Sequence, residues 1–328
     1  MKALVYDTFG PPGDVLELRD VDKPVVTDDG VLVRVHASSV NPAEWHFVTG
    51  TPYLARFAFG LRKPRSGRVG TDFAGTVEAV GKDVTQFEPG DEVFGGKAGA
   101  FAEYVCVPED GPVVPKPTDV TFEQAAAVPI AGLTALQGLR DKGRLRAGQK
   151  VLVNGASGGV GTFAVQIAKA LGAEVTGVCS TRNVEMVRSI GADHVVDYTQ
   201  EDFTLRGLRY DLMLDNIGNR SWSECRRVLA DKATLVAIGG PKTNRWLGPL
   251  GRLAAMRLAS LFTSQTAVFF VAKFNKPDLA ALHDLLADGK VTPVIDRTYP
   301  LSETPAALMY LGEGHVRGKV VVTVAGGD

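Results

Sequence analysis

The chain contains little cysteine, and what it has is scattered. Its 328 residues include three cysteines, Cys106, Cys179 and Cys225, which are widely spaced and odd in number. That pattern fits neither a disulfide framework nor a structural zinc site with several cysteine ligands. A reducing compartment is the simplest interpretation.

An excess of charge is also absent, because 36 basic residues face 37 acidic ones and the formal net charge is −1. Without a basic block, the electrostatic footprint of a nucleic-acid-binding protein is missing. The most apolar stretch, 246–272, contains Arg252 and Arg257 and is too polar to cross a membrane. The first residues lack the apolar core and cleavage site of a secretory signal. We therefore expect a cytoplasmic protein with neither nucleic acid nor membrane as a partner.

A glycine-rich turn between a strand pattern and a helix pattern is the most informative stretch that is present. The strand pattern 150–154 runs into this turn, and a helix pattern follows over 161–171. A helix N-terminus offers N–H groups and a positive dipole end to a phosphate, and glycines let the backbone approach it closely. Such turns also serve as plain connections, but the flanking elements favour a dinucleotide pyrophosphate. The residues we assign to it are Gly155, Ala156, Ser157, Gly158, Gly159 and Val160.

The pattern of predicted secondary structure differs between the first and the later part of the chain. The first part contains short strand patterns separated by Gly and Pro, at 31–37, 76–80 and 92–94. This order is typical of a compact barrel-like unit. Two helix patterns, 122–128 and 132–139, then lead into alternating strands and helices, which indicate a doubly wound parallel sheet. Its expected strands are 150–154, 174–179, 194–197, 210–215, 233–238 and 267–271, with helices at 161–171 and 183–190. After 273 we expect one helix, 277–288, and one closing strand, 320–324. This order predicts a substrate cleft between a barrel and a nucleotide domain.

Together these motifs resemble the medium-chain dehydrogenase/reductase superfamily, and within it the zinc-free, zeta-crystallin-like quinone oxidoreductases. The best-matched stretch is 148–169, and further matches are 41–42, 70–75, 89–93, 131–135 and 314–319. The resemblance spans essentially the whole chain and implies an α/β fold. A GroES-like β-rich barrel domain, 1–117 and 273–328, would surround a Rossmann domain with a doubly wound parallel sheet, 118–272. A homodimer is also implied, joined at the apolar edge near Phe269 and Phe270.

The tip of the second Rossmann strand favours NADPH over NADH. An NAD-binding Rossmann domain carries an acidic residue about 20 positions beyond its glycines, whereas 177–183 contains Ser180 and Arg182 and no carboxylate. A hydroxyl and a guanidinium suit a dianionic 2′-phosphate. Ser180 could instead only cap the next helix, and Arg182 could only be solvated. The resemblance adds further cofactor-site residues: Thr134, Tyr198, Gly239, Phe270 and Arg317.

No metal site is expected. The zinc enzymes of the superfamily use a Cys and His tripod, and at those places this chain has Asn41 and the segment 70–72. An electron-poor acceptor therefore fits better than an unactivated alcohol. We predict hydride transfer from NADPH to a quinone or related acceptor. An NADPH-dependent 2-enoyl or 2-alkenal double-bond reductase is one alternative, and a non-catalytic, crystallin-like NADPH-binding protein is another.

Three residues are candidates for catalysis: Asn41, His46 and Tyr53. The Asn41 amide could donate to the substrate, or the residue could only form a turn before Pro42. His46 stands where quinone reductases usually carry Tyr, and it could donate a proton or simply be packed. Tyr53 begins a segment, 51–69, in which aromatic and basic residues interleave; it could cover a flat acceptor or form a surface helix. The segment 246–262 could form an opposite wall or ordinary core.

Overall fold

The computed structural model describes residues 1–240, 246 and 250–324 and contains two compact units. The first comprises Met1–Leu133, Phe274–Asp288 and Pro293–Asp328, and the second comprises Thr134–Lys273 and Gly289–Thr292. This division differs from the predicted domain bounds over residues 118–133, at 273 and over 289–292, and the first of these differences is the largest. Residues 118–133 join the first unit because helix α4 (Phe122–Ala126) packs on strands of that unit.

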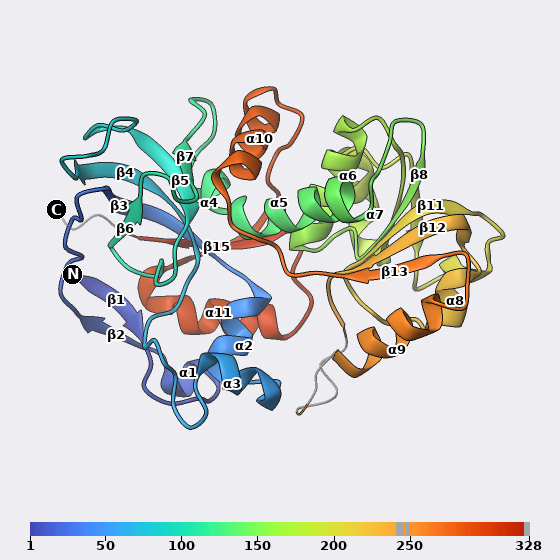
Figure 1. Ribbon diagram of the computed structural model, residues 1–328, viewed down its shortest axis with the longest axis horizontal. Helices are drawn as coiled ribbons and strands as arrows, with labels where there is room; N and C mark the ends of the chain where they lie inside the picture. Colours follow the sequence, from blue (N-terminus) through green and yellow to red (C-terminus); the bar gives the residue numbers. More distant parts are fainter. Residues whose placement is uncertain (241–245, 247–249, 325–328) are drawn as a thin grey trace. The chain divides into compact units, whose positions relative to one another are not determined.

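A six-stranded parallel sheet forms the centre of the second unit (Figure 1). Its strands are β8 (Lys150–Asn154), β9 (Glu174–Cys179), β10 (His194–Asp197), β11 (Tyr210–Asp215), β12 (Leu229–Ala237) and β13 (Thr266–Phe269). They lie in the order β10-β9-β8-β11-β12-β13. Because the chain starts in the middle and winds outward in both directions, this is the doubly wound arrangement, with its switch point between β8 and β11. The predicted parallel sheet is confirmed.

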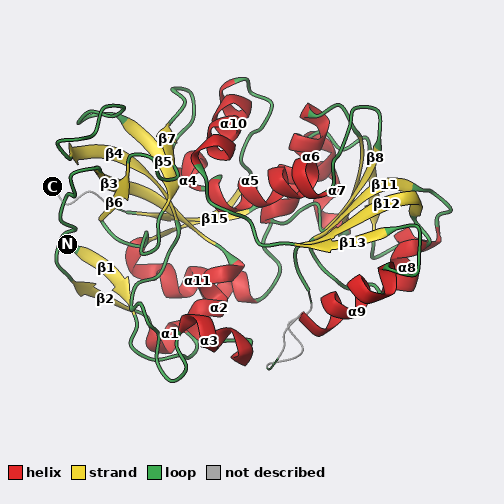
Figure 2. Cartoon of the chain, in the orientation of Figure 1, coloured by secondary structure: helices red, strands yellow, loops and turns green. Residues whose placement is uncertain are grey.

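Helices cover both faces of this sheet. They are α6 (Gly159–Ala170), α7 (Val184–Ser189), α8 (Trp222–Arg226) and α9 (Leu250–Ser260). α6 and α7 lie on one face, and α8 and α9 lie on the other (Figure 2). Strands covered on both sides read as continuous apolar runs, which is why β8 buries four consecutive residues after Lys150.

The first unit is built on a seven-stranded, mostly antiparallel sheet. The order is β14-β15-β3-β4-β5-β7, β6 pairs with β3, and β1 and β2 form a separate pair. The bounds are β1 (Lys2–Val5), β2 (Glu17–Asp20), β3 (Gly30–Val40), β4 (Asp72–Val80), β5 (Glu92–Gly96), β6 (Tyr104–Pro108), β7 (Val113–Pro115), β14 (Ile295–Pro300) and β15 (Lys319–Thr323). Phe73 and Phe101 are fully buried in the core of this unit.

The remaining helices are α1 (Pro12–Val15), α2 (Pro42–Thr49), α3 (Arg56–Phe59), α5 (Pro129–Leu136), α10 (Lys276–Ala287) and α11 (Thr304–Gly312). The prediction of one helix and one strand after 273 is wrong, because β14 and α11 lie between α10 and β15. β14 is only partly buried or exposed along its length, so no alternating pattern marks it. α11 opens with a proline in its first turn, where proline is tolerated, although in sequence it suggests a break.

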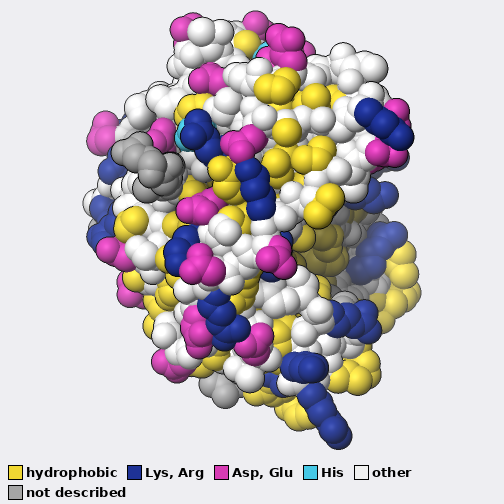
Figure 3. Space-filling model, turned by 90° about the vertical axis from the view of Figure 1, so that its left-hand side faces the viewer, with side chains coloured by type: hydrophobic (Ala, Val, Ile, Leu, Met, Phe, Trp, Pro, Cys, Tyr) yellow, Lys and Arg dark blue, Asp and Glu magenta, His cyan; other side chains and the backbone are white. Residues whose placement is uncertain are grey.

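The surface carries charges of both signs. In Figure 3, basic and acidic side chains are interspersed over the face shown, which agrees with the near-zero net charge. In the part of the chain that the structure describes, no helix combines the length and the apolar character needed to span a membrane.

Candidate functional site

The glycine-rich turn between β8 and α6 is tightly wound. Gly155 has φ +82°, a left-handed conformation that favours glycine. The N–H groups of Gly155 and Ala156 donate to the carbonyl of Val178 on β9, at 3.1 and 3.0 Å. A Cβ on Gly161 would stand 2.0 Å from the Gly155 carbonyl oxygen. Only glycine therefore lets the first turn of α6 pack on this corner.

The N-terminus of α6 suits an anion. Its N-cap residue is Gly158, so no side chain caps the helix. The first N–H groups of an α-helix have no intrahelical acceptor and form the positive end of its dipole. A Cβ on Gly158 would meet no atom closer than the Gly155 oxygen at 3.6 Å, so the backbone is open to close approach at this point. The residues present fit a pyrophosphate.

The tips of β8 and β9 are joined by hydrogen bonds. The buried Asn183 side-chain amide donates to Ser157 Oγ at 3.1 Å and to Ser180 Oγ at 3.3 Å. Ser180 precedes a 3₁₀ turn (Thr181–Asn183), but its side chain makes no cap hydrogen bond, so it does not cap the following turn in this structure. Arg182 is exposed in that turn. The Tyr198 N–H donates to the Cys179 carbonyl at 3.0 Å, which brings Tyr198 to the same edge.

The other predicted cofactor residues divide between the two units. Gly239 follows β12, and a Cβ there would stand 2.1 Å from the Asn216 carbonyl oxygen, so glycine is required. Thr134 lies on α5, and Phe270 follows β13 in the same unit. Arg317 belongs to the first unit, where it is exposed and its N–H donates to Asp296.

A buried ion pair at the carboxyl edge of the sheet escaped the sequence reasoning. Asp215, the fully buried last residue of β11, accepts hydrogen bonds from Asn154 Nδ2 at 2.8 Å and from the Gly218 N–H at 2.9 Å. Arg252 Nη2 on α9 lies 3.3 Å from it. These contacts hold the loop after β11, whose Ile217 lies against Gly155 of the glycine-rich turn. The available signal was an acidic residue directly after the apolar run Leu212–Leu214.

In the first unit, Asn41 begins α2 and is nearly inaccessible to solvent. Its Nδ2 donates to Asp72 Oδ2 at 2.9 Å and to the Ser39 carbonyl at 3.3 Å, and its Oδ1 accepts from Lys319 Nζ. Both amide hydrogens are therefore used within the protein in this arrangement. The catalytic role of Asn41 stays a prediction.

Asn41 lies in a buried cluster of charged residues, which we define as Glu44, Asp72 and Lys319. Burial, and secondarily the charge of Asp72, raise the pKa of Glu44 to about 7. Burial also raises the pKa of Asp72 and lowers that of Lys319. Sequence reasoning missed the cluster because its members come from three distant segments. A lone lysine before the apolar run of β15 was the available signal.

His46 and Tyr53 lie on and just after α2. His46 Nδ1 contacts the Thr51 carbonyl at 2.8 Å, and because a carbonyl only accepts, Nδ1 carries the hydrogen. The Arg56 guanidinium stands 4.8 Å from the centre of the Tyr53 ring. The segment 51–69 contains a 3₁₀ turn (Tyr53–Ala55) and α3, so its beginning is helical, and the contact of Tyr53 with a substrate stays a prediction.

Comparisons with known proteins agree with this architecture. A family model described as "Alcohol dehydrogenase GroES-like domain" matches residues 27–118, and one described as "Zinc-binding dehydrogenase" matches residues 190–322. The mitochondrial NAD(P)H oxidoreductase RTN4IP1 of Mus musculus is 34% identical, with 99% of this chain and 89% of that protein covered. The chloroplast envelope quinone oxidoreductase homolog of Arabidopsis thaliana is 33% identical, with 98% of each covered. The quinone oxidoreductase from Coxiella burnetii superposes with a TM-score of 0.85 at 32% identity, covering 99% of each chain.

The chain belongs to the quinone oxidoreductase branch of the medium-chain dehydrogenase/reductase superfamily. The predicted family and the GroES-like plus Rossmann fold class are thereby confirmed. The first relatives are named mitochondrial or chloroplast proteins, so the cytoplasmic location of this family member stays a prediction.

The metal tripod of the superfamily's zinc enzymes has no counterpart in the described residues of this member. Over 1–240, 246 and 250–324, no three His, Cys, Asp or Glu side chains are grouped so as to hold a metal ion. Burial raises the pKa of Cys179 to about 11 and that of Cys225 to about 12, so both thiols stay protonated near neutral pH. A protonated thiol is a poor metal ligand.

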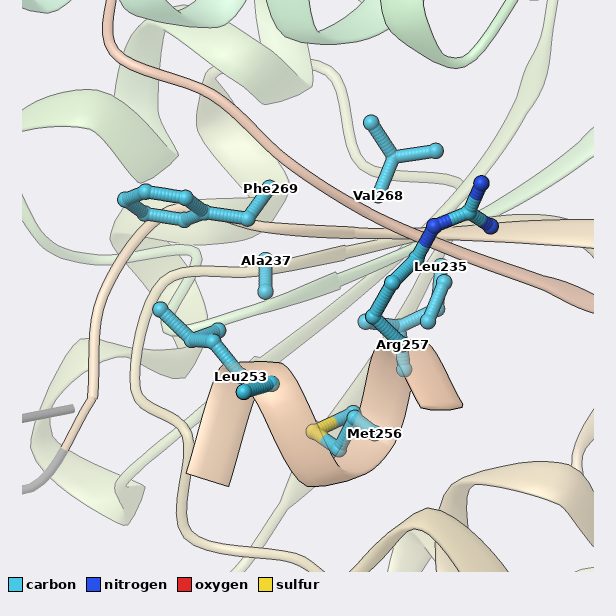
Figure 4. Close-up of a pocket in the computed structure, with 9 residues that line it drawn as sticks. Leu235, Ala237, Leu253, Met256, Arg257, Val268 and Phe269 are labelled. Carbon is cyan, nitrogen blue, oxygen red and sulfur yellow. The ribbon is translucent and has the colours of Figure 1, made fainter. Parts of the chain in front are cut away.

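An apolar pocket of about 470 Å³ lies between α9 and the strands β12 and β13 (Figure 4). Leu253 and Met256 of α9 line it and also belong to a buried core cluster with Leu235. For these two residues of the segment 246–262, ordinary core packing is therefore the better interpretation. Leu247 of that segment lies outside the described residues.

Proposed function

We propose that this chain is an NADPH-dependent, zinc-independent reductase that passes a hydride to a quinone or a related electron-poor acceptor. The glycine-lined N-terminus of α6 carries the proposal, because its amides and Cβ-free surface fit a dinucleotide pyrophosphate. The reduced nicotinamide, when bound, supplies the hydride. The names of the relatives, NAD(P)H oxidoreductase and quinone oxidoreductase homolog, support this reaction class.

In this proposal the coenzyme is held mainly by the second unit. The corner 155–160 binds the pyrophosphate, and Ser180, Arg182 and Tyr198 bind the 2′-phosphate. The positions proposed for the rest of the coenzyme site are Thr134, Gly239, Phe270 and Arg317. Arg182 is exposed at the tip of β9, where a guanidinium can grip a phosphate in bidentate fashion.

On the acceptor side we assign His46 as the proton donor and Tyr53 as a substrate contact. With Nδ1 bonded to the Thr51 carbonyl, a protonated His46 can release the proton on Nε2 without turning its ring. Asn41 lies at the start of α2, and its side chain makes three hydrogen bonds within the protein. In this proposal it positions the helix that carries His46.

Rapid-mixing kinetics test the reaction. The chain loaded with NADPH is mixed with quinones and with α,β-unsaturated carbonyl compounds, and coenzyme oxidation is followed by absorbance. We expect faster oxidation by quinones. Faster oxidation by enones would favour the double-bond reductase, which the 32% identity to 2-methylene-furan-3-one reductase of Solanum lycopersicum supports. Tight NADPH binding with no oxidation by any acceptor would contradict both and leave a binding protein.

Arg182→Ala tests the coenzyme assignment. Loss of a charge-assisted contact to the 2′-phosphate should weaken NADPH binding about tenfold and leave NADH binding unchanged. Arg188→Ala is the matched control, since Arg188 is exposed on α7 and pairs with Glu185. Equal effects of the two substitutions on NADPH would refute the role of Arg182.

We also propose a homodimer formed by the edge of the second unit. β13 is the last strand of its sheet, and Phe269 at its end is 41% exposed. An apolar strand edge invites pairing with a second chain, and two-fold symmetry closes that contact.

A further inference from the structure

A carboxylate lies next to the segment assigned to the 2′-phosphate, although none occurs at the tip of β9 itself. Asp197 is the last residue of β10, and it is in register with Cys179, the last residue of β9. Its Oδ2 accepts a hydrogen bond from Thr181 Oγ1 at 2.6 Å. Thr181 stands between Ser180 and Arg182. The neighbouring strand thus supplies the acidic group that the second strand lacks.

This carboxylate is ionised, and its hydrogen-bond partners in the described part of the chain are hydroxyl and amide groups. Its Oδ1 accepts from the N–H of Thr199 at 2.9 Å and from its hydroxyl at 2.7 Å. The hydrogen bond from Thr181, with those from Thr199, holds the pKa of Asp197 below its usual value. Within the residues that the structure describes, no lysine or arginine forms an ion pair with it. Among these described residues, hydroxyl and amide dipoles balance its negative charge.

We propose that Asp197 limits the preference of this site for NADPH. This inference rests on the proposed function, and it adds a residue whose effect on a 2′-phosphate is opposite to that of Arg182. The Asp197 charge repels a 2′-phosphate at the tip of β9, while the Arg182 charge attracts it. Asp197 already accepts hydrogen bonds from the Thr181 hydroxyl and from the N–H and hydroxyl of Thr199, so its effect on a 2′-phosphate comes from its charge. NADH therefore binds with an affinity closer to that of NADPH than Arg182 alone would allow.

Asp197→Asn tests the charge with little change of shape. Asparagine keeps an oxygen for the Thr199 N–H, and its amide can donate to the Thr181 hydroxyl. Dissociation constants for NADPH and NADH are measured by coenzyme fluorescence on the full chain at low salt. We expect NADPH to bind about three- to tenfold more tightly, with NADH unchanged or weaker. The gain should shrink at 0.5 M salt, because exposed charges are then screened.

Two further variants separate charge from structure. Glu174→Gln removes the same charge from the first residue of β9, far from the carboxyl ends of the strands. It should leave the ratio of the affinities for NADPH and NADH unchanged. Thr181→Val removes the hydroxyl but keeps the Asp197 charge. Its preference for NADPH over NADH, measured as a ratio of affinities, should therefore stay below that of Asp197→Asn. An unchanged ratio in Asp197→Asn, or an equal shift in Glu174→Gln, would overturn this inference alone. If the unmodified chain bound neither dinucleotide, the proposed function would fall and this inference with it.

Discussion

At the scale of single residues, the cluster around Asn41 places Glu44, Asp72 and Lys319 where water does not reach. Lys319 Nζ lies 3.7 Å from Asp72 Oδ2, and Asp72 Oδ1 accepts the Ile130 N–H at 3.0 Å. Buried charges are tolerated only when paired or hydrogen-bonded. One ammonium group faces two carboxyl groups, so Glu44 is the member that gains most from holding a proton.

Glu44 should make the stability of the fold depend on pH. Its pKa is about 7 in the folded chain against 4.5 for an ordinary glutamate, so between these values the folded state holds a proton that the unfolded state has released. The free energy of unfolding should therefore fall as pH rises from 4.5 to 7 and level off above. Relative to Glu44→Gln, the loss should be on the order of 3 kcal/mol. Chemical denaturation at a series of pH values measures it.

Glu88→Gln is the control for this pH series, because Glu88 is exposed in the same unit. Its curve should run parallel to that of the unmodified chain. A constant difference between Glu44→Gln and the unmodified chain from pH 4.5 to 7 would show that Glu44 ionises normally in the fold.

At the scale of elements, two glycines of the β8–turn–α6 unit have different roles. A Cβ on Gly161 would clash with the backbone of the turn, at 2.0 Å from the Gly155 oxygen. A Cβ on Gly158, where φ is −84°, would meet protein only at 3.6 Å. Gly161 thus serves the packing of the fold, whereas Gly158 keeps the backbone open to a ligand.

Alanine substitutions should separate these two tasks. Gly161→Ala should lower the free energy of unfolding by about 1–3 kcal/mol without any ligand present, as overpacking does. Gly158→Ala should leave stability within about 0.5 kcal/mol of the unmodified chain but weaken NADPH binding, because its methyl group occupies the approach to the amides. Denaturation curves and coenzyme titrations measure both. If Gly158→Ala bound NADPH normally, the pyrophosphate would not lie on this turn.

At the scale of the whole molecule, the outer edge of β13 predicts association. A chain of 34.9 kDa should elute with about twice that mass in light-scattering chromatography. Phe269→Lys places a charge on the proposed contact and should shift the protein to the monomer. Val25→Lys, on a highly exposed position of the first unit, should not. A monomeric unmodified chain would refute the homodimer.

The parts of the fold that could be predicted from the sequence are those encoded locally. The apolar run of β8, the glycines after it and the spacing of strands and helices predicted the parallel sheet, because periodicity and turn chemistry act over a few residues. β14 and α11 could not be predicted in this way, since β14 lacks an alternating pattern and α11 has a proline in its first turn.

The sequence by itself determined that a strand, a glycine-rich turn and a helix follow one another at 150–170, since Gly155 takes a left-handed backbone conformation and Gly161 allows a close approach that a side chain would prevent. Only the tertiary structure decided which side chains meet across distant segments. Lys319 reaches Asn41 across 278 positions because β15 and β3 pair, and Asp197 reaches Thr181 because β10 and β9 pair. Strand pairing depends on the packing of the whole core. A local sequence pattern therefore does not predict which charged residue of a neighbouring strand lies at a site.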